Sequence, residues 1–187
     1  MLDVFLQVLQ IGLLGFFLSL ILASAVHKLK EPARFRQALV AYELLPQSWA
    51  LSTAKVVPYI ELGVITLAVI AFALGSPFIT GLFILGLFAA YAAFLAYATL
   101  TKKTLEDCGC SLNISVADVA PARLLVRNLI LMALVAAFYA SSQSYSDAMS
   151  VWAMGIVFSL IIFITYSSID GLLENHALLE NLRVRHD

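Results

Sequence analysis

The stretch VFLQVLQIGLLGFFLSLILASAV, from Val4 to Val26, has 23 residues and no formal charge. An α-helix rises about 1.5 Å per residue, so a run of this length crosses a hydrocarbon core of about 30 Å. Ala23-Ser24-Ala25 is similar to a signal-peptidase site, but positive charge follows the run and none precedes it. We therefore interpret the run as an uncleaved membrane anchor.

The amino-acid composition indicates that the rest of the chain also belongs to a membrane protein. Of 187 residues, 62% are hydrophobic and 12% are charged, against about 45–50% and about 25% in an average soluble domain. Four further apolar runs follow the first: Leu51 or Val56 to Leu74, Phe78 to Leu100, Leu124 to Ala140, and Ala148 to Ile169. The pattern predicts an all-α, polytopic membrane protein in contact with lipid. The net charge of −1 gives no indication of nucleic-acid binding.

Polar segments divide the predicted single membrane domain, residues 1–187. Residues 28–46 have apolar side chains at helical spacing and predict an amphipathic helix at the membrane surface. Residues 101–122 form a polar loop that contains both cysteines. Residues 170–187 form a polar tail with one apolar stripe, predicted as a short surface helix. This leaves a four-helix core, residues 1–141, and a fifth transmembrane helix, residues 148–169.

The distribution of basic residues predicts the orientation of the protein in the membrane. If five runs cross, the surface helix, the cysteine loop and the tail all lie on one side of the membrane. That side then carries all eleven Lys and Arg residues. Because basic residues concentrate on the cytoplasmic side of membrane proteins, this face is predicted to be cytoplasmic.

The most informative motif is Cys108-Gly109-Cys110. A disulfide between these cysteines closes a very small ring, and glycine relieves the crowding within it. Such strain makes a disulfide easily reduced, so the pair favours thiol–disulfide exchange over a structural link. Two alternatives stay open: half of a Cu(I) or zinc site, or two cysteines without chemistry. We predict Cys108 and Cys110 as the catalytic pair, and no metal site.

Glu61 is the second candidate, because an ionisable side chain within an apolar run is costly and marks a functional site by default. Arg127 lies one turn inside the fourth run and near the same level. One interpretation is an ion pair of Glu61 with Arg127 or with Lys55 that fixes helix register. The other is a role for Glu61 in proton handling.

Two further polar residues lie near this level. His27 ends the first run, and Asn128 follows Arg127; Asn128 either bridges helices by hydrogen bonding or is passive. The helix count predicts that the candidate residues converge at one end of the bundle: Cys108, Cys110, Glu61, Arg127 and His27.

These motifs together resemble the MauE family, a branch of the DoxX-like membrane proteins. The resemblance covers about Leu18 to Ala140. The matching stretches are Ala23–Leu29, Pro32, Phe35, Tyr42–Pro46, Pro58–Leu62, Asp107–Cys110 and Arg127–Leu129. Ser111-Leu112 departs from the Phe-Gly or Gly-Gly common in relatives. The resemblance implies a DoxX-like four-helix bundle, to which the fifth run is added as in full-length MauE proteins.

The resemblance also implies a function. MauE proteins act in maturing the disulfide-rich, periplasmic small subunit of methylamine dehydrogenase, with a thioredoxin-like partner of the MauD type. This implies a location in the bacterial inner membrane and exchange through Cys108 and Cys110. The resemblance also implies a membrane quinone as electron acceptor, as in oxidoreductases of the vitamin K epoxide reductase type, although no residue in the sequence marks a quinone site.

The charge pattern and the resemblance disagree about the cysteines, because charge assigns them to the cytoplasmic face and the client is periplasmic. Either the charge rule fails, the loop dips into the bundle, or the protein relays electrons between compartments. Two other function classes compete with thiol exchange. These are a non-enzymatic membrane scaffold, and a quinone-linked sulfur oxidoreductase like other DoxX relatives.

Overall fold

The computed structural model describes residues 2–41, 46–101, 121–140 and 148–184, and every regular element in these ranges is an α-helix. The helices are α1 (Leu2–Lys30), α2 (Pro32–Ala41), α3 (Gln47–Ala73), α4 (Pro77–Leu100), α5 (Pro121–Ala140) and α6 (Met149–Val184). The prediction of an all-α fold is confirmed.

Four of the helices are long and apolar enough to cross a membrane: α1, α3 from Ser48, α4, and α6 as far as Leu172. This agrees with a polytopic membrane protein. The fourth predicted crossing corresponds to α5, which has 20 residues and carries Arg123 and Arg127 near its start, and it is not among these four. The count of five crossings therefore stays a prediction.

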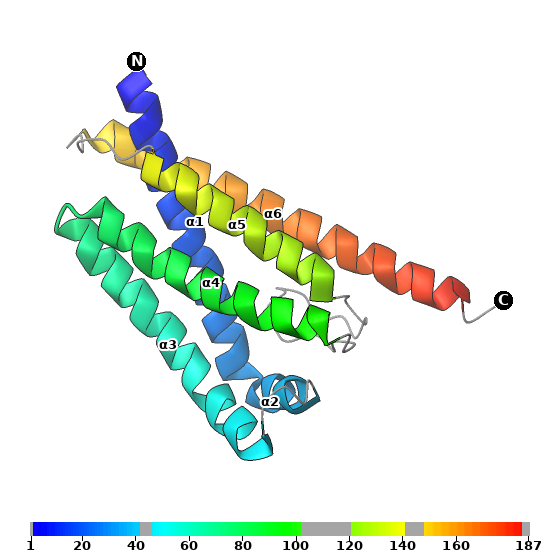
Figure 1. Cartoon of the computed structure of the whole chain (residues 1–187). Helices are drawn as coiled ribbons and strands as arrows, with labels where there is room; N and C mark the ends of the chain where they lie inside the picture. Colours follow the sequence, from blue (N-terminus) through cyan, green and yellow to red (C-terminus); the bar gives the residue numbers. More distant parts are fainter. Residues whose placement is uncertain (1, 42–45, 102–120, 141–147, 185–187) are drawn as a thin grey trace.

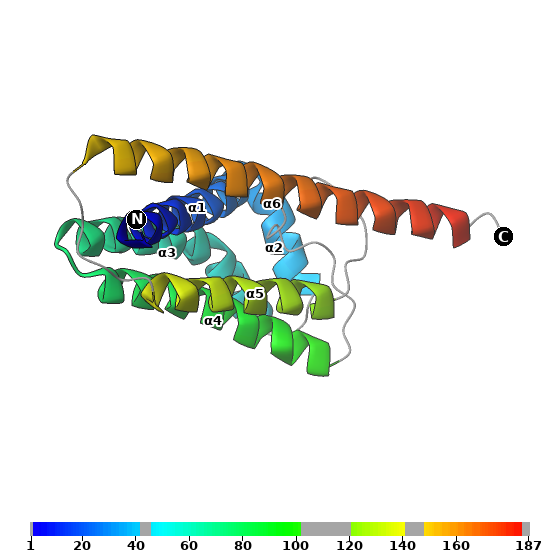
Figure 2. The ribbon, with the colours of Figure 1, turned by 90° about the horizontal axis from the view of Figure 1, so that it is seen from above.

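Helix α1 is the central element of the bundle. It lies between α6 on one side and α3, α4 and α5 on the other (Figure 2). In the apolar part of α1, 56% of the residues are buried, against 17% in α6, which packs mainly against α1. The pairs α3–α4 and α4–α5 complete the bundle (Figure 1). The central helix is therefore the one best placed to carry buried polar groups.

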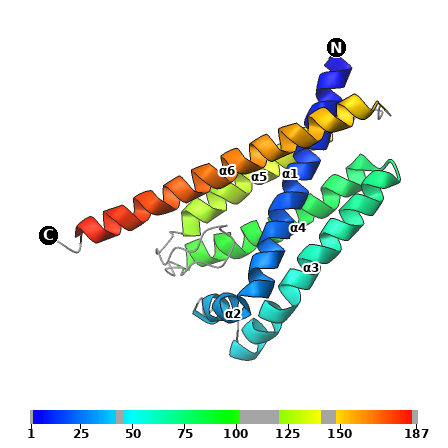
Figure 3. The same ribbon diagram turned by 180° about the vertical axis from the view of Figure 1, so that it is seen from behind.

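The two ends of the bundle differ in what they gather. One end has the start of α1, the turn between α3 and α4, the end of α5 and the start of α6 (Figure 1). The other end has the last turn of α1, helix α2, the start of α3, the end of α4 and the start of α5 (Figure 3). We call this second end the α2 end.

The amphipathic segment at residues 28–46 differs in detail from its prediction. Lys28 belongs to the last turns of α1, and the described surface segment is α2, which begins at Pro32. Phe35 and Leu39 are buried against Ala50 of α3 and Leu95 of α4. The apolar stripe of α2 thus packs on the bundle, because the starts of α3 and α5 and the end of α4 offer it a protein surface in place of lipid.

The chain beyond Asp170 also differs from its prediction. The sequence analysis expects a separate short surface helix, whereas α6 continues without a break as far as Val184 (Figure 1). Residues 170–184 contain no proline, and Gly171 is their only glycine, so no strong signal ends the helix.

Close approach between α1 and α6 depends on glycine. A Cβ atom added at Gly155 would come within 2.5 Å of Ile11, and one added at Gly15 within 2.6 Å of the Ser159 hydroxyl. A side chain at Gly12 would collide with the ring of Phe158. Small residues allow membrane helices to approach closely, and here they bring α6 against the central helix.

Candidate functional site

A buried ion pair joins α1 to α3. Nζ of Lys28 lies 2.6 Å from Oε1 of Glu61, and the two side chains are 0% and 1% exposed. Glu61 sits within the apolar length of α3 and Lys28 near the end of α1. A charge buried in this way needs a partner of opposite charge, because the interior does not replace its hydration.

Two hydroxyl groups complete the contacts of Oε1. Ser24 donates a hydrogen bond of 2.9 Å and Tyr91 one of 2.6 Å to this oxygen. The ammonium group of Lys28 also donates to the hydroxyl oxygens of Ser24, at 2.8 Å, and Tyr91, at 3.1 Å. Ser24 lies one turn before Lys28 on α1, and Tyr91 belongs to α4. The four groups form one network across three helices.

Two aromatic rings lie close to the ammonium group of Lys28. Nζ of Lys28 lies 5.0 Å from the ring centroid of Tyr91 and 5.2 Å from that of Phe35 on α2. A cation at this distance from an aromatic face is attracted by the ring, and more strongly where water is excluded. Helix α2 therefore covers the Lys28 side of the network.

A second ion pair joins α5 to α6. Nη1 of Arg127 lies 2.9 and 3.1 Å from the two carboxylate oxygens of Asp170. The Arg127 side chain is 21% exposed and that of Asp170 12%. This pair links two helices that have few direct backbone contacts with each other.

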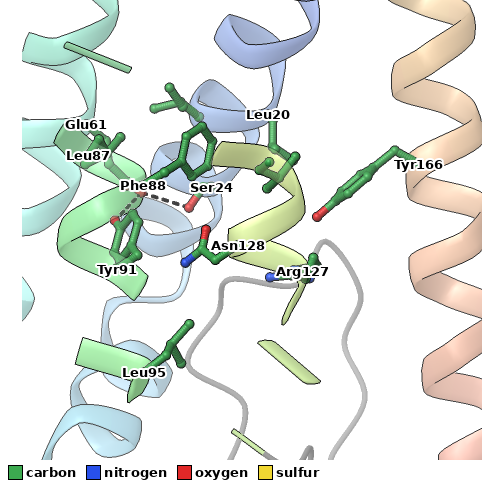
Figure 4. Close-up of a pocket in the computed structure, with 12 residues that line it drawn as sticks. Leu20, Ser24, Glu61, Leu87, Phe88, Tyr91, Leu95, Arg127, Asn128 and Tyr166 are labelled. Atoms are coloured by element: carbon green, nitrogen blue, oxygen red, sulfur yellow. Dashed lines mark hydrogen bonds between the residues drawn. The ribbon is translucent and has the colours of Figure 1, made fainter. Parts of the chain in front are cut away.

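Between the two ion pairs lies a pocket (Figure 4). Its polar lining comes from Ser24, Glu61, Tyr91, Arg127 and Asn128. The hydroxyl of Tyr166 on α6 points toward it, and leucine, isoleucine and phenylalanine side chains form the rest of the wall. The cavity volume is about 40 Å³, room for a few water molecules.

The structure brings together three of the residues predicted from sequence, namely Glu61, Arg127 and Asn128, and all three line the pocket. His27 is half-buried and is not among the lining residues. Cys108 and Cys110 lie outside the described residues, so their predicted convergence with Glu61 stays a prediction.

Both predicted partners of Glu61 are wrong. Glu61 pairs with Lys28, whereas Arg127 pairs with Asp170. Lys55 lies on α3 and is exposed. A sequence signal for the true partner exists: Ser24 and Lys28 are four residues apart and so share one face of α1. Sequence reasoning had no comparable signal for Tyr91.

The site also bears on two ligands raised by the sequence, a metal ion and a quinone. Among the described residues, no three His, Cys, Asp or Glu side chains are grouped so that they could hold a metal ion. The pocket has space for water-sized molecules, about 40 Å³, and a membrane quinone stays a prediction.

The fold and the site define a class: a multi-pass membrane protein with a buried polar network near one end of its helix bundle. A family model described as methylamine utilisation protein MauE matches residues 4–141. The chain therefore belongs to the MauE family, as its motifs indicate, and its role lies in methylamine utilisation. No curated protein and no solved structure is similar enough to count as a match.

Proposed function

We propose that this chain is a thiol–disulfide maturation factor of the bacterial inner membrane, acting on the small subunit of methylamine dehydrogenase. The observation that carries the proposal is Cys108-Gly109-Cys110 in a member of the MauE family. The sequence contains no other cysteine, so any thiol chemistry of the chain runs through this pair.

The reaction is an exchange with a thioredoxin-like partner of the MauD type. A thiolate of the partner attacks the disulfide between Cys108 and Cys110, which forms a mixed disulfide and releases one thiolate of the pair. The second partner thiolate then attacks the mixed disulfide. One disulfide is broken and one is formed, and the released thiolates take up the protons that the attacking thiols lost.

Two features of the described residues support the proposal. Helix α4 ends at Leu100 and α5 begins at Pro121, and both of these helix ends lie at the α2 end (Figure 1). The network of Lys28 and Glu61 joins α1, α3 and α4. It therefore holds α4, the helix that precedes the motif, against α1 and α3.

The Cys108→Ser/Cys110→Ser double variant tests this function. We expect cells with this variant to accumulate small subunit with missing or wrong disulfides, visible by mass spectrometry of alkylated protein. Ser111→Ala, which alters the neighbouring residue and no thiol, is the matched control and should mature the client normally. Normal client disulfides in the double variant would refute thiol exchange and favour the scaffold interpretation.

The side of the membrane needs a separate measurement. Two of the eleven basic residues, Lys28 and Arg127, are paired within the bundle, which weakens the charge bias toward a cytoplasmic face. A periplasmic client requires that an impermeant thiol reagent label Cys108 in intact cells. Labelling only after the membrane is permeabilised would exclude direct exchange with periplasmic protein.

A further inference from the structure

The two carboxylate oxygens of Glu61 have opposite surroundings. Oε1 accepts hydrogen bonds from Lys28, Ser24 and Tyr91. Oε2 is buried, and no donor among the described residues lies within hydrogen-bonding distance of it. Leaving a buried acceptor unsatisfied costs about 1–3 kcal/mol, and more when the group is charged. The network therefore supplies hydrogen-bond donors to Oε1 only, and Oε2 needs a donor from outside the network.

The pocket beside Glu61 has space for that donor. Its volume of about 40 Å³ compares with about 10–15 Å³ for one water molecule. Water in an apolar cavity needs several polar partners, and Glu61, Ser24, Tyr91 and Asn128 supply them here. Arg127 lines the same pocket and is 21% exposed, so the polar lining extends from the buried carboxylate toward the surface. In Figure 4, Asn128 is seen between Tyr91 and Arg127.

We propose that this pocket is a water-filled proton site, in which water donates to Oε2 of Glu61 and carries protons between Glu61 and the surface beside Arg127. In the transfer step, a hydronium ion in the pocket gives its proton to Oε2. An O–H bond forms on the carboxyl group, a neutral water remains, and no electrons move. Oε1 keeps its three donors, so Lys28 stays in place while Oε2 gains and loses the proton.

Charged and titratable groups from several helices lie around Glu61. The charged and titratable groups that face the pocket or the network are Lys28 from α1, Tyr91 from α4, Arg127 from α5, and Tyr166 and Asp170 from α6; α2 contributes the ring of Phe35. With Glu61 ionised, two positive and two negative charges balance.

Infrared difference spectroscopy of the full chain in lipid vesicles tests the proposal. When the pH is lowered, we expect a carbonyl stretch from a protonated buried carboxyl group that shifts in D₂O. Glu61→Gln should abolish this band. Glu31→Gln, which removes a partly exposed carboxylate on the short link between α1 and α2, is the matched control and should keep it. Absence of any Glu61-dependent band across the pH range in which the protein stays folded would overturn the proposal.

A second variant keeps Glu61 and tests the role of water, and it serves also if Glu61→Gln fails to fold. Asn128→Leu replaces a polar pocket wall with an apolar side chain of similar size. Loss of a bridging water should make deuterium exchange of the carboxyl group about tenfold slower. An unchanged exchange rate would overturn the route through the pocket. The proton site does not rest on the cysteine chemistry, so Cys108→Ser/Cys110→Ser should retain the band even where client maturation fails.

Discussion

The two ion pairs of the bundle show how differently the same chemistry is used within one membrane protein. Lys28 and Glu61 are fully buried, share two hydroxyl partners and lie under aromatic rings. Arg127 and Asp170 are partly exposed, and Nη1 of Arg127 donates to both carboxylate oxygens of Asp170. The first pair connects helices that are already in close contact, and the second connects helices that are not.

The difference in burial indicates how much each ion pair contributes to the stability of the bundle. Burial makes the loss of one partner from the Lys28–Glu61 pair costly, because the remaining charge has no access to bulk water. Partial exposure lets the groups of the Arg127–Asp170 pair regain some hydration when separated, so that pair contributes less. We therefore infer that the buried pair fixes the bundle, and that the exposed pair adds only modestly to the attachment of α6.

Breaking the buried pair should have the largest effect on stability. Glu61→Gln leaves the Lys28 charge buried, and we expect a loss of about 3–5 kcal/mol in the free energy of unfolding. Lys28→Met should cost a similar amount. The double variant Lys28→Met/Glu61→Gln removes both charges and should cost less than the sum of the two, as measured by denaturation in detergent micelles. Additive losses would show that the two side chains are not coupled.

The glycine contact between α1 and α6 should rank second. Gly155→Ala places a methyl group against Ile11, and overpacking of this kind costs about 1–3 kcal/mol. Gly63→Ala is the matched control, because a Cβ atom there meets no other atom within 4 Å. Equal effects of the two substitutions in the same denaturation assay would contradict the close packing of α6 on α1.

The exposed pair should show the smallest effect. Asp170→Asn keeps the shape of the side chain and removes the charge that Arg127 contacts, and we expect a loss of about 1 kcal/mol. The measurement is the same unfolding titration, compared with Glu31→Gln at the weak surface pair with Arg34, 3.6 Å long. A loss as large as that of Glu61→Gln would mean that the two ion pairs do not differ as their burial indicates.

Sequence reasoning placed Glu61 and Arg127 near one level of the bundle, because a charge within an apolar run stands out and helix length sets its depth. The structure adds that both line one pocket, together with Asn128. Sequence reasoning did not identify the ion-pair partners of Glu61 and Arg127. Any cation near the same level could have reached Glu61, and depth along the membrane does not say which way a side chain points around its helix. The same limit explains α2, whose apolar stripe is compatible with either lipid or protein.

By itself, the sequence determined the all-α membrane fold, the family and the level of the charged residues, because hydrophobic run length and motif spacing are properties of the chain alone. Only the tertiary structure decided that Lys28 is the partner of Glu61 and that Tyr91 and Ser24 complete the network. It also decided that Oε2 of Glu61 is buried without a hydrogen-bond donor among the described residues. These facts depend on the rotation of each helix about its axis, which packing fixes through contacts distant in sequence.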